Sequence, residues 1–474
     1  MADRPATFRD VFAVAEFRVL FASFGVFMIG ETVKMLALSV LVYERTGSGL
    51  LAALAYVTGF LPHALGGVFL LALADRWPAR ALIAGYDLVR LAMVAVLATG
   101  VLPPGAMLGL VAVVGLFGPV SSASRSALLP EVLHGDRYVL GRSLLTVASG
   151  GTQVAGFALG GLLLGLVGPY GALWLTAATC GLSALVVRIG LARRPARARP
   201  SRVRPVRIRP ARPWLTRSRP TTAATGPAAG EPVAAGLSVA GPAAASRPAA
   251  GPTAGPVTDG RASGGAVRET LRVNRQLLAD RRIRGLLLAQ WLPGSLLVGA
   301  EGVAVPYAAD LGPGGSAGVL LMAGAGGMLV GDLLVGRFVA PATRERWTPW
   351  LALLLGVPML AFVAQPALVP AAALFAVATG GFAYQLGLAR RFLDAVPEAR
   401  RGQAFGLLST GLMATQGLAA AGGGALSEVF APGVVMAVAG AASVAATLTL
   451  WPVLRPAAAH RPIHPDAVGA APDR

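Results

Sequence analysis

Charged residues are scarce in this chain of 474 residues. Only 13% of them are Asp, Glu, Lys or Arg, whereas about 25% are charged in soluble globular domains. The single cysteine, Cys180, excludes a disulfide framework and a cysteine-ligated metal site. Because 55% of the residues are hydrophobic, the composition excludes a disordered chain and an ordinary soluble enzyme. It indicates a polytopic membrane protein.

Twelve long apolar runs follow one another along the chain. A transmembrane helix needs about 20 mostly apolar residues, and the runs are close to or above that length. They are too long for barrel strands and lack the alternation that such strands show. We therefore predict an all-α membrane protein with twelve transmembrane helices, at residues 17–43, 49–74, 81–99, 105–126, 139–167, 169–187, 283–307, 316–335, 347–364, 368–388, 403–426 and 432–450.

Arginine is distributed unevenly between the two sides of the predicted bundle. On one side the connections together contain a single basic residue, Arg45; these are residues 43–49, 100–105, 167–169, 308–316, 364–368 and 426–432. The connections on the other side contain arginine repeatedly, for example Arg137 and Arg344. Cytoplasmic loops are enriched in basic residues. We therefore expect a multi-pass protein of the cell membrane with both termini in the cytoplasm.

The chain divides into two halves that share a weak repeat. Four residues of the first half recur in the second half with identical spacing: Gln153, Gly160, Gly161 and Pro169 correspond to Gln416, Gly423, Gly424 and Pro432. A duplicated six-helix unit predicts two pseudo-symmetric six-helix bundles that flank a central site. The expected divisions are an N-terminal bundle at 1–190, a linker at 191–265, a C-terminal bundle with a leading amphipathic helix at 266–455, and a tail at 456–474.

The predicted linker is strongly basic. Residues 188–219 contain twelve arginines and no acid, and the Pro, Ala and Gly content of the segment predicts disorder. Our main interpretation is a cytoplasmic tether that also enforces the topology. The alternative is contact with anionic lipid headgroups. Nucleic-acid binding is disfavoured, because Trp214 is the only aromatic residue among these arginines and stacking on bases requires several.

Charged residues inside the predicted spans are the strongest functional signal, because charge in the bilayer is costly. Glu31 and Lys34 are three residues apart in the first span and share a helix face. Lys34 is also the only lysine in the chain. Glu301 occupies a comparable depth in the seventh span, so Glu31 and Glu301 are predicted to face one cavity. Glu31, Lys34 and Glu301 are the residues expected to set the electrostatics of that cavity and to couple transport to protons. The alternative is a static ion pair between Glu31 and Lys34.

Further polar and small residues in the spans are expected to support the structure. Asp87 and Arg90 form a second pair three residues apart, and Arg125 and Asp332 are additional intramembrane charges. Gly-rich stretches favour close helix packing. The sequence has no Gly-Lys-Ser/Thr phosphate loop, which argues against an ATP-driven pump. We expect neither a cofactor, nor a metal, nor an enzymatic activity.

The segment after the second span resembles a motif of the major facilitator superfamily. Residues 74–80 read Ala-Asp-Arg-Trp-Pro-Ala-Arg, and the family pattern is Gly-x-x-x-Asp-Arg-x-Gly-Arg-Arg. Asp75, Arg76 and Arg80 match it, whereas its two glycines and its penultimate arginine are replaced. The resemblance implies a secondary transporter with two rocking bundles. It also implies that these three residues form a cytoplasmic conformational latch, with the Asp at a helix N-terminus of the other half.

Several stretches also resemble the branch of that superfamily that contains enterobactin exporters and macrolide efflux proteins, at residues 43–48, 84–90, 124–130 and 396–402. A Gly-Pro-x-x-Gly-Gly motif of exporters is matched by Gly156, Gly160 and Gly161, with Phe157 in place of the proline. The resemblance implies proton-coupled efflux, by antiport, of a small organic solute or drug, and we expect a monomer. The alternatives are a proton-coupled importer and a non-transporting membrane scaffold or receptor that uses the Arg-rich segment.

Overall fold

The computed structural model describes residues 7–59, 62–63, 65–66, 77–134, 136–194, 272–312 and 315–455. Every secondary-structure element in these residues is a helix, which confirms the predicted all-α class. The predicted tail at 456–474, and all of the predicted linker except 191–194, lie outside the described residues.

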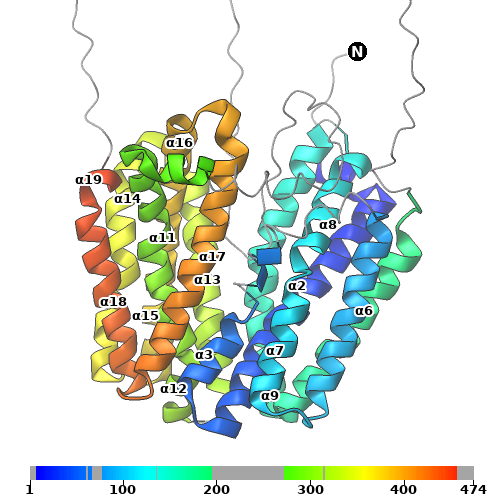
Figure 1. The fold of residues 1–474 in the computed structure, drawn as a ribbon, viewed down its shortest axis with the longest axis horizontal. Coiled ribbons are helices and arrows are strands. Elements are labelled where there is room, and N and C mark those ends of the chain that lie inside the picture. Colours follow the sequence, from blue (N-terminus) through cyan, green and yellow to red (C-terminus); the bar gives the residue numbers. More distant parts are fainter. Residues whose placement is uncertain are drawn as a thin grey trace, which may run out of the picture.

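The elements form two groups that stand side by side (Figure 1). The N-terminal group contains α1 (Phe8–Phe12), α2 (Ala15–Thr46), α3 (Gly49–Val57), α6 (Ala79–Ala98), α7 (Pro104–Gly115), α8 (Gly118–Val132) and α9 (Asp136–Gly190). The C-terminal group contains α11 (Arg281–Gly302), α12 (Ala304–Leu311), α13 (Gly315–Phe338), α14 (Pro341–Gly356), η1 (Pro358–Ala364), α15 (Leu368–Gly380), η2 (Gly381–Ala383), α16 (Tyr384–Ala395), η3 (Glu398–Arg400), α17 (Arg401–Leu426), α18 (Pro432–Thr449) and α19 (Trp451–Leu454).

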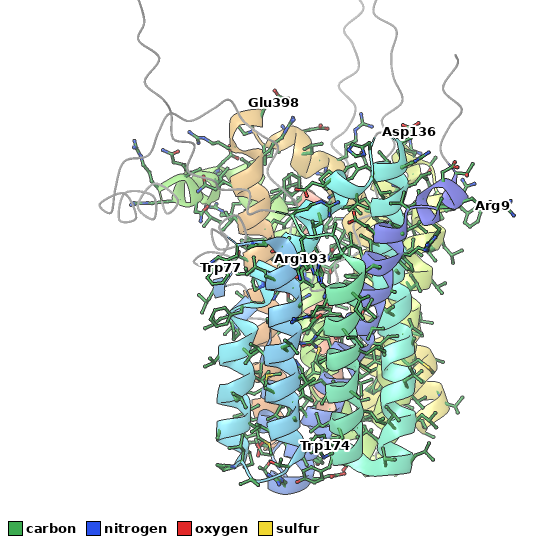
Figure 2. All side chains as sticks on the ribbon, turned by 90° about the vertical axis from the view of Figure 1, so that its right-hand side faces the viewer. Arg9, Trp77, Asp136, Trp174, Arg193 and Glu398 are labelled. Carbon is green, nitrogen blue, oxygen red and sulfur yellow. The ribbon has the colours of Figure 1, made fainter. Side chains whose placement is uncertain are left out.

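The two ends of the bundle differ. Arg9, Asp136 and Glu398 lie at one end and Trp174 lies near the other (Figure 2). We call the first end the arginine-rich face. The second, which carries the connections at 47–48, 99–103 and 427–431, is called the short-loop face. The two groups of helices diverge toward the arginine-rich face and approach each other at the short-loop face (Figure 1).

The predicted spans agree with the helices in most of the described chain. Ten helical stretches there are long and apolar enough to cross a membrane. One of them, Asp136–Gly190, contains two predicted spans, because Gly168 interrupts it with φ 67° and ψ 178°. That conformation is readily available only to glycine. The second predicted span, 49–74, is described only in part, at 49–59, 62–63 and 65–66.

Local sequence signals set the turn from α2 into α3. Gly47 ends α2 in the left-handed conformation, with φ 64°, which glycine adopts without steric cost. Ser48 then caps α3, since its hydroxyl accepts a hydrogen bond from the Leu51 N–H at 3.1 Å. Together these two residues place the first turn of α3 at the short-loop face, beside the C-terminal group.

Glycines allow the two groups to touch. A Cβ on Gly318 of α13 would collide with Gly161 of α9, and a Cβ on Gly49 of α3 would collide with Ser427 beyond α17. A Cβ on Gly424 would lie 2.6 Å from Ala53 Cβ. Gly161 and Gly424 are equivalent positions of the sequence repeat, so each half uses the same glycine to contact the other half.

Gly156 and Gly160, which belong with Gly161 to the exporter-like glycine motif, make their contacts within the N-terminal group. A Cβ on Gly156 would lie 2.7 Å from Thr32 Cβ, and a Cβ on Gly160 would lie 3.1 Å from Leu36 Cδ2. Both contacts are between α9 and α2. Small residues there allow the close approach of two helix backbones, which holds α2 in the position that the site requires.

Replacement of Gly424 by Ala is expected to loosen the short-loop face. The added Cβ would lie 2.9 Å from the Gly49 carbonyl oxygen, so α3 and α17 must move apart, at a cost of about 1–3 kcal/mol. Spin labels at Val101 and Val369, both exposed, would report this movement as a longer distance, after Cys180 is replaced by Ala.

The matched control is Gly422→Ala, because a Cβ on Gly422 meets no atom within 4 Å. This variant should leave the label distance unchanged. Equal distances in the Gly424 and Gly422 variants would show that the glycine contact does not hold the two groups together.

Candidate functional site

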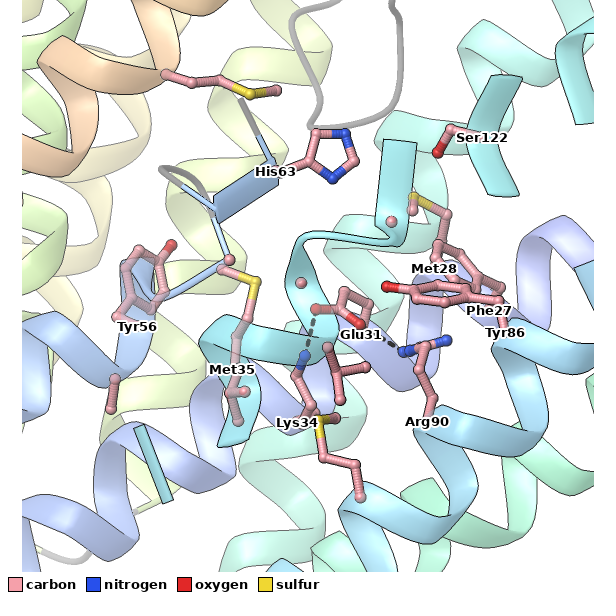
Figure 3. A pocket seen from close by; sticks show the side chains of 18 residues that line it. Phe27, Met28, Glu31, Lys34, Met35, Tyr56, His63, Tyr86, Arg90 and Ser122 are labelled. Carbon is pink, nitrogen blue, oxygen red and sulfur yellow. Dashed lines mark hydrogen bonds and ion pairs between the residues drawn. The ribbon is translucent and has the colours of Figure 1, made fainter. Parts of the chain in front are cut away.

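A pocket lies among the helices of the N-terminal group and extends to α17 of the C-terminal group (Figure 3). It encloses about 800 Å³, part of which is open to solvent. Aromatic, methionine and small apolar side chains make up most of the wall, and Met413 is the contribution of α17. Its ionic side chains, within the described residues, are Glu31, Lys34 and Arg90.

Helical periodicity turns one face of α2 and one face of α6 toward the pocket. Positions three and four residues apart lie on the same side of a helix. On α2 the lining residues follow this spacing, at Phe27, Met28, Glu31, Lys34 and Met35. On α6 they do the same, at Tyr86, Arg90 and Met93.

Glu31 binds two cations from two helices. Lys34 Nζ donates to Glu31 Oε1 at 2.5 Å, and Arg90 Nη2 donates to Glu31 Oε2. The side chains of Lys34 and Arg90 are 6% and 1% exposed, whereas 22% of Glu31 is exposed. The structure therefore brings Glu31 and Lys34 together as their spacing suggested. It adds Arg90 from α6 as a second partner.

Asp87 connects Arg90 to a third cation. Arg125 Nη2 donates to Asp87 Oδ2 at 3.2 Å, and the Ser183 hydroxyl donates to the same oxygen at 2.6 Å. Arg90 Nη1 lies 3.9 Å from Asp87 Oδ1, which is too long for a hydrogen bond. The charged side chains thus form a row of alternating sign, in the order Lys34, Glu31, Arg90, Asp87, Arg125. We call these five residues the buried charge row.

Phe27 covers two cations of the buried charge row. The guanidinium carbon of Arg90 is 4.3 Å from the centre of the Phe27 ring, and that of Arg125 is 5.1 Å from it. A cation over an aromatic face is attracted by about 0.5–2 kcal/mol, depending on solvent exposure. The ring therefore contributes to holding these guanidinium groups in apolar surroundings.

Glu301 lies apart from Glu31. It belongs to α11 of the C-terminal group and is not among the residues that line the pocket. The Tyr56 hydroxyl of α3 donates a long hydrogen bond of 3.4 Å to Glu301 Oε2, and Tyr56 does line the pocket. The predicted shared cavity is thus replaced by an indirect connection through a tyrosine that crosses between the two groups.

The remaining predicted residues lie elsewhere. Asp332 of α13 is 5% exposed, and no residue in the described ranges forms an ion pair or hydrogen bond with it. Arg80 donates to the carbonyl oxygens of Leu191, at 3.0 Å, and Arg188, where α9 ends and a cation is favourable. The other two residues of the predicted latch, Asp75 and Arg76, lie outside the described residues.

Glu428 connects the two groups at the short-loop face, and the sequence analysis had not singled it out. Its Oε1 accepts hydrogen bonds from the Leu50 N–H, at 2.9 Å, and the Ser48 hydroxyl, at 2.7 Å. These bonds hold the pKa of Glu428 below its ordinary value because they stabilise the carboxylate. The first turn of α3 is therefore capped by a residue of the connection between α17 and α18.

Comparisons with known proteins agree with the fold. No family model and no curated protein matches the sequence. Among solved structures, that of the POT family transporter PepTSo is similar to the structure of this chain, with a TM-score of 0.61 and 11% sequence identity. The match covers 93% of this chain and 97% of that one. The chain therefore shares the all-α fold of that transporter structure, and its many long apolar helices are those of a multi-pass membrane protein.

Removal of Arg90 should destabilise the N-terminal group. Arg90→Gln leaves Glu31 with Lys34 as its one cation. It also removes the positive charge that lies 3.9 Å from the Asp87 carboxylate. Breaking a buried ion pair in this way costs about 3–5 kcal/mol, so the midpoint of thermal unfolding in detergent should fall. Arg390→Gln is the control, because Arg390 is exposed and lies 3.9 Å from Asp394; its loss should cost about 0–1 kcal/mol. Equal effects of the two variants would contradict a structural role for the buried charge row.

Acidic pH should weaken the contact that Glu428 makes. Because the pKa of Glu428 in this contact is lowered, its contribution is complete above the ordinary glutamate value of about 4.3 and is lost as the pH falls through the lowered pKa. The equilibrium constant between the closed and the open short-loop face should then fall about two- to fivefold, since a carboxylate at a helix N-terminus contributes about 0.3–1 kcal/mol. The distance between labels at Val101 and Val369 measures this.

Glu428→Gln should remove the acid-induced change in that distance. Glu44→Gln is the matched control, because Glu44 is an exposed acid of the same face, and the change should persist in it. Persistence of the full pH response in Glu428→Gln would assign the response to another group.

Proposed function

We propose that the protein is a secondary transporter of the major facilitator type, which moves a small organic solute across the cell membrane by alternating access and couples this movement to protons. The observation that carries the proposal is the pocket itself. It lies deep among apolar helices, receives side chains from both groups and contains ionic side chains. Ionisable residues at such a depth are costly and mark substrate or proton pathways. The likeness to a POT family transporter supports the same class.

The contacts between the two groups support alternating access. At the short-loop face, Gly424 packs against Ala53 and Glu428 binds Leu50, while the groups diverge toward the arginine-rich face (Figure 1). A rocking motion about the pocket would separate α3 from α17 and open the short-loop face. We place that face outside the cell, because its connections are poor in arginine.

Glu31, Lys34 and Glu301 are the proposed coupling residues. Glu31 contacts the pocket directly, and Glu301 is connected to it by Tyr56. Asp75, Arg76 and Arg80 remain the proposed latch of the arginine-rich face. The sequence resemblance favours efflux by antiport, and import by symport is the alternative.

Replacement of Glu31 tests the proposed coupling. Proteoliposomes that contain the pH dye pyranine would be screened with a panel of metabolites and drugs, and the sign of the proton flux would separate symport from antiport. Glu31→Gln should abolish movement of substrate driven by a pH gradient, because the side chain can no longer exchange a proton. It should leave counterflow exchange, which needs no net proton movement.

The control is Glu398→Gln, since Glu398 is 84% exposed and pairs with Arg401. Its transport should match that of the unmodified protein. If both proton-driven transport and counterflow survive in Glu31→Gln at unmodified rates, Glu31 does not couple transport to protons. If no compound of the panel moves protons with the unmodified protein, the proposed function itself is contradicted.

A further inference from the structure

The buried charge row carries an excess of positive charge. It contains three cations, Lys34, Arg90 and Arg125, and two carboxylates, Glu31 and Asp87. Solvent screens this excess charge weakly, because the five side chains are at most 22% exposed. Among the described residues, one positive charge of this row is therefore left without a counter-ion, in a region where an unbalanced charge is costly.

Two of the three cations of the buried charge row lie in the wall of the pocket. Glu31 is the only acid among the described residues that line it, whereas Lys34 and Arg90 both line it. Nε and Nη1 of Arg90 are buried atoms of a side chain that is only 1% exposed, and they have no hydrogen-bond partner within the described part of the chain. The Lys34 ammonium has three donors, of which one is bound to Glu31. The two cations thus retain donors that Glu31 does not use.

The wall around these cations is suited to a flat or flexible apolar body. Phe27 and Tyr86 lie next to Arg90 (Figure 3), and Met28, Met35 and Met93 also line the pocket. Thioether side chains adapt to apolar groups of different shape and make favourable contacts with aromatic rings.

We propose that the pocket binds an organic anion, whose carboxylate or sulfonate contacts Lys34 and Arg90 and whose apolar or aromatic body lies against Phe27, Tyr86 and the methionines. A neutral solute would leave the excess charge uncompensated. A cationic solute would be repelled by two cations around a single carboxylate that already binds both. This inference names the substrate class of the proposed transporter and therefore rests on that function.

The anion and Glu31 share the same two cations. Neutralisation of Glu31 removes the competing carboxylate and therefore strengthens anion binding. If the neutralising agent is a proton, proton and anion bind together, and this linkage is reciprocal. Two ligands that bind together move in the same direction, so an anionic substrate favours the import alternative.

The proposal can be tested by binding alone, without a gradient. Three fluorescent probes share one aromatic body and differ in charge: dansylglycine is an anion, its amide is neutral and dansylcadaverine is a cation. Purified full-length protein in nanodiscs of neutral lipid should bind dansylglycine about tenfold or more tightly than the amide, because hydrogen bonds to charged groups are the stronger ones. The cation should bind most weakly.

Variants assign the preference to the pocket. Glu31→Gln should tighten dansylglycine binding about tenfold, and Lys34→Gln should reduce the preference for the anion to about twofold or less. These comparisons are needed because the twelve arginines of residues 188–219 attract any anion. Arg390→Gln is the control for an exposed cation and should change nothing.

Equal or tighter binding of the amide or the amine, or no saturable binding of dansylglycine, would overturn the proposal. So would an anion preference that persists unchanged in both Glu31→Gln and Lys34→Gln, because the arginine-rich segment would then be its source. If Lys34→Gln fails to fold, the affinities of the three probes for the unmodified protein and for Glu31→Gln still test whether the pocket binds an anion. Selective anion binding by a protein that moves no protons in proteoliposomes would retain this inference and contradict the proposed coupling.

Discussion

The interaction of one carboxylate with two cations underlies the site. Glu31 fixes α2 against α6, because its two oxygens bind Lys34 of its own helix and Arg90 of the neighbouring one. Without this carboxylate, the Lys34 ammonium and the Arg90 guanidinium would lose the counter-ion that they share. The stacking of Arg90 on Phe27 and the shape of the pocket follow from this arrangement.

A second constraint acts between the halves, and it is steric. Gly161 and Gly424 hold equivalent places in the sequence repeat and each touches the opposite half, at Gly318 and at Ala53. A repeated contact of this kind is expected when two similar bundles are related by an axis through a central site. Small residues make the contact close without strong directional bonds, which suits an interface that has to open and close.

Hydropathy predicted most of the helices from the sequence, because lipid requires long apolar segments. Helical spacing correctly placed Glu31 beside Lys34, because residues three positions apart are neighbours on one helix face. It also suggested the ion pair of Asp87 with Arg90, which the structure contains at 3.9 Å. The hydrogen bonds of these two residues go to other partners, from Arg90 to Glu31 and from Arg125 to Asp87. Those partners are set by the rotation of one helix against another, which no local pattern encodes. Glu428 was missed for the same reason, since its partners lie 378 and 380 residues away.

The distance in sequence between Glu428 and Ser48 has a consequence for the synthesis of the protein. The ribosome delivers α3 early, and N-terminal parts of a chain generally fold first. Until the connection after α17 emerges, the Leu50 N–H has only water or lipid headgroups as acceptors. The connection between α17 and α18 therefore supplies the hydrogen-bond acceptor for the first turn of α3, which is made much earlier. A nascent chain truncated before residue 428 lacks that acceptor.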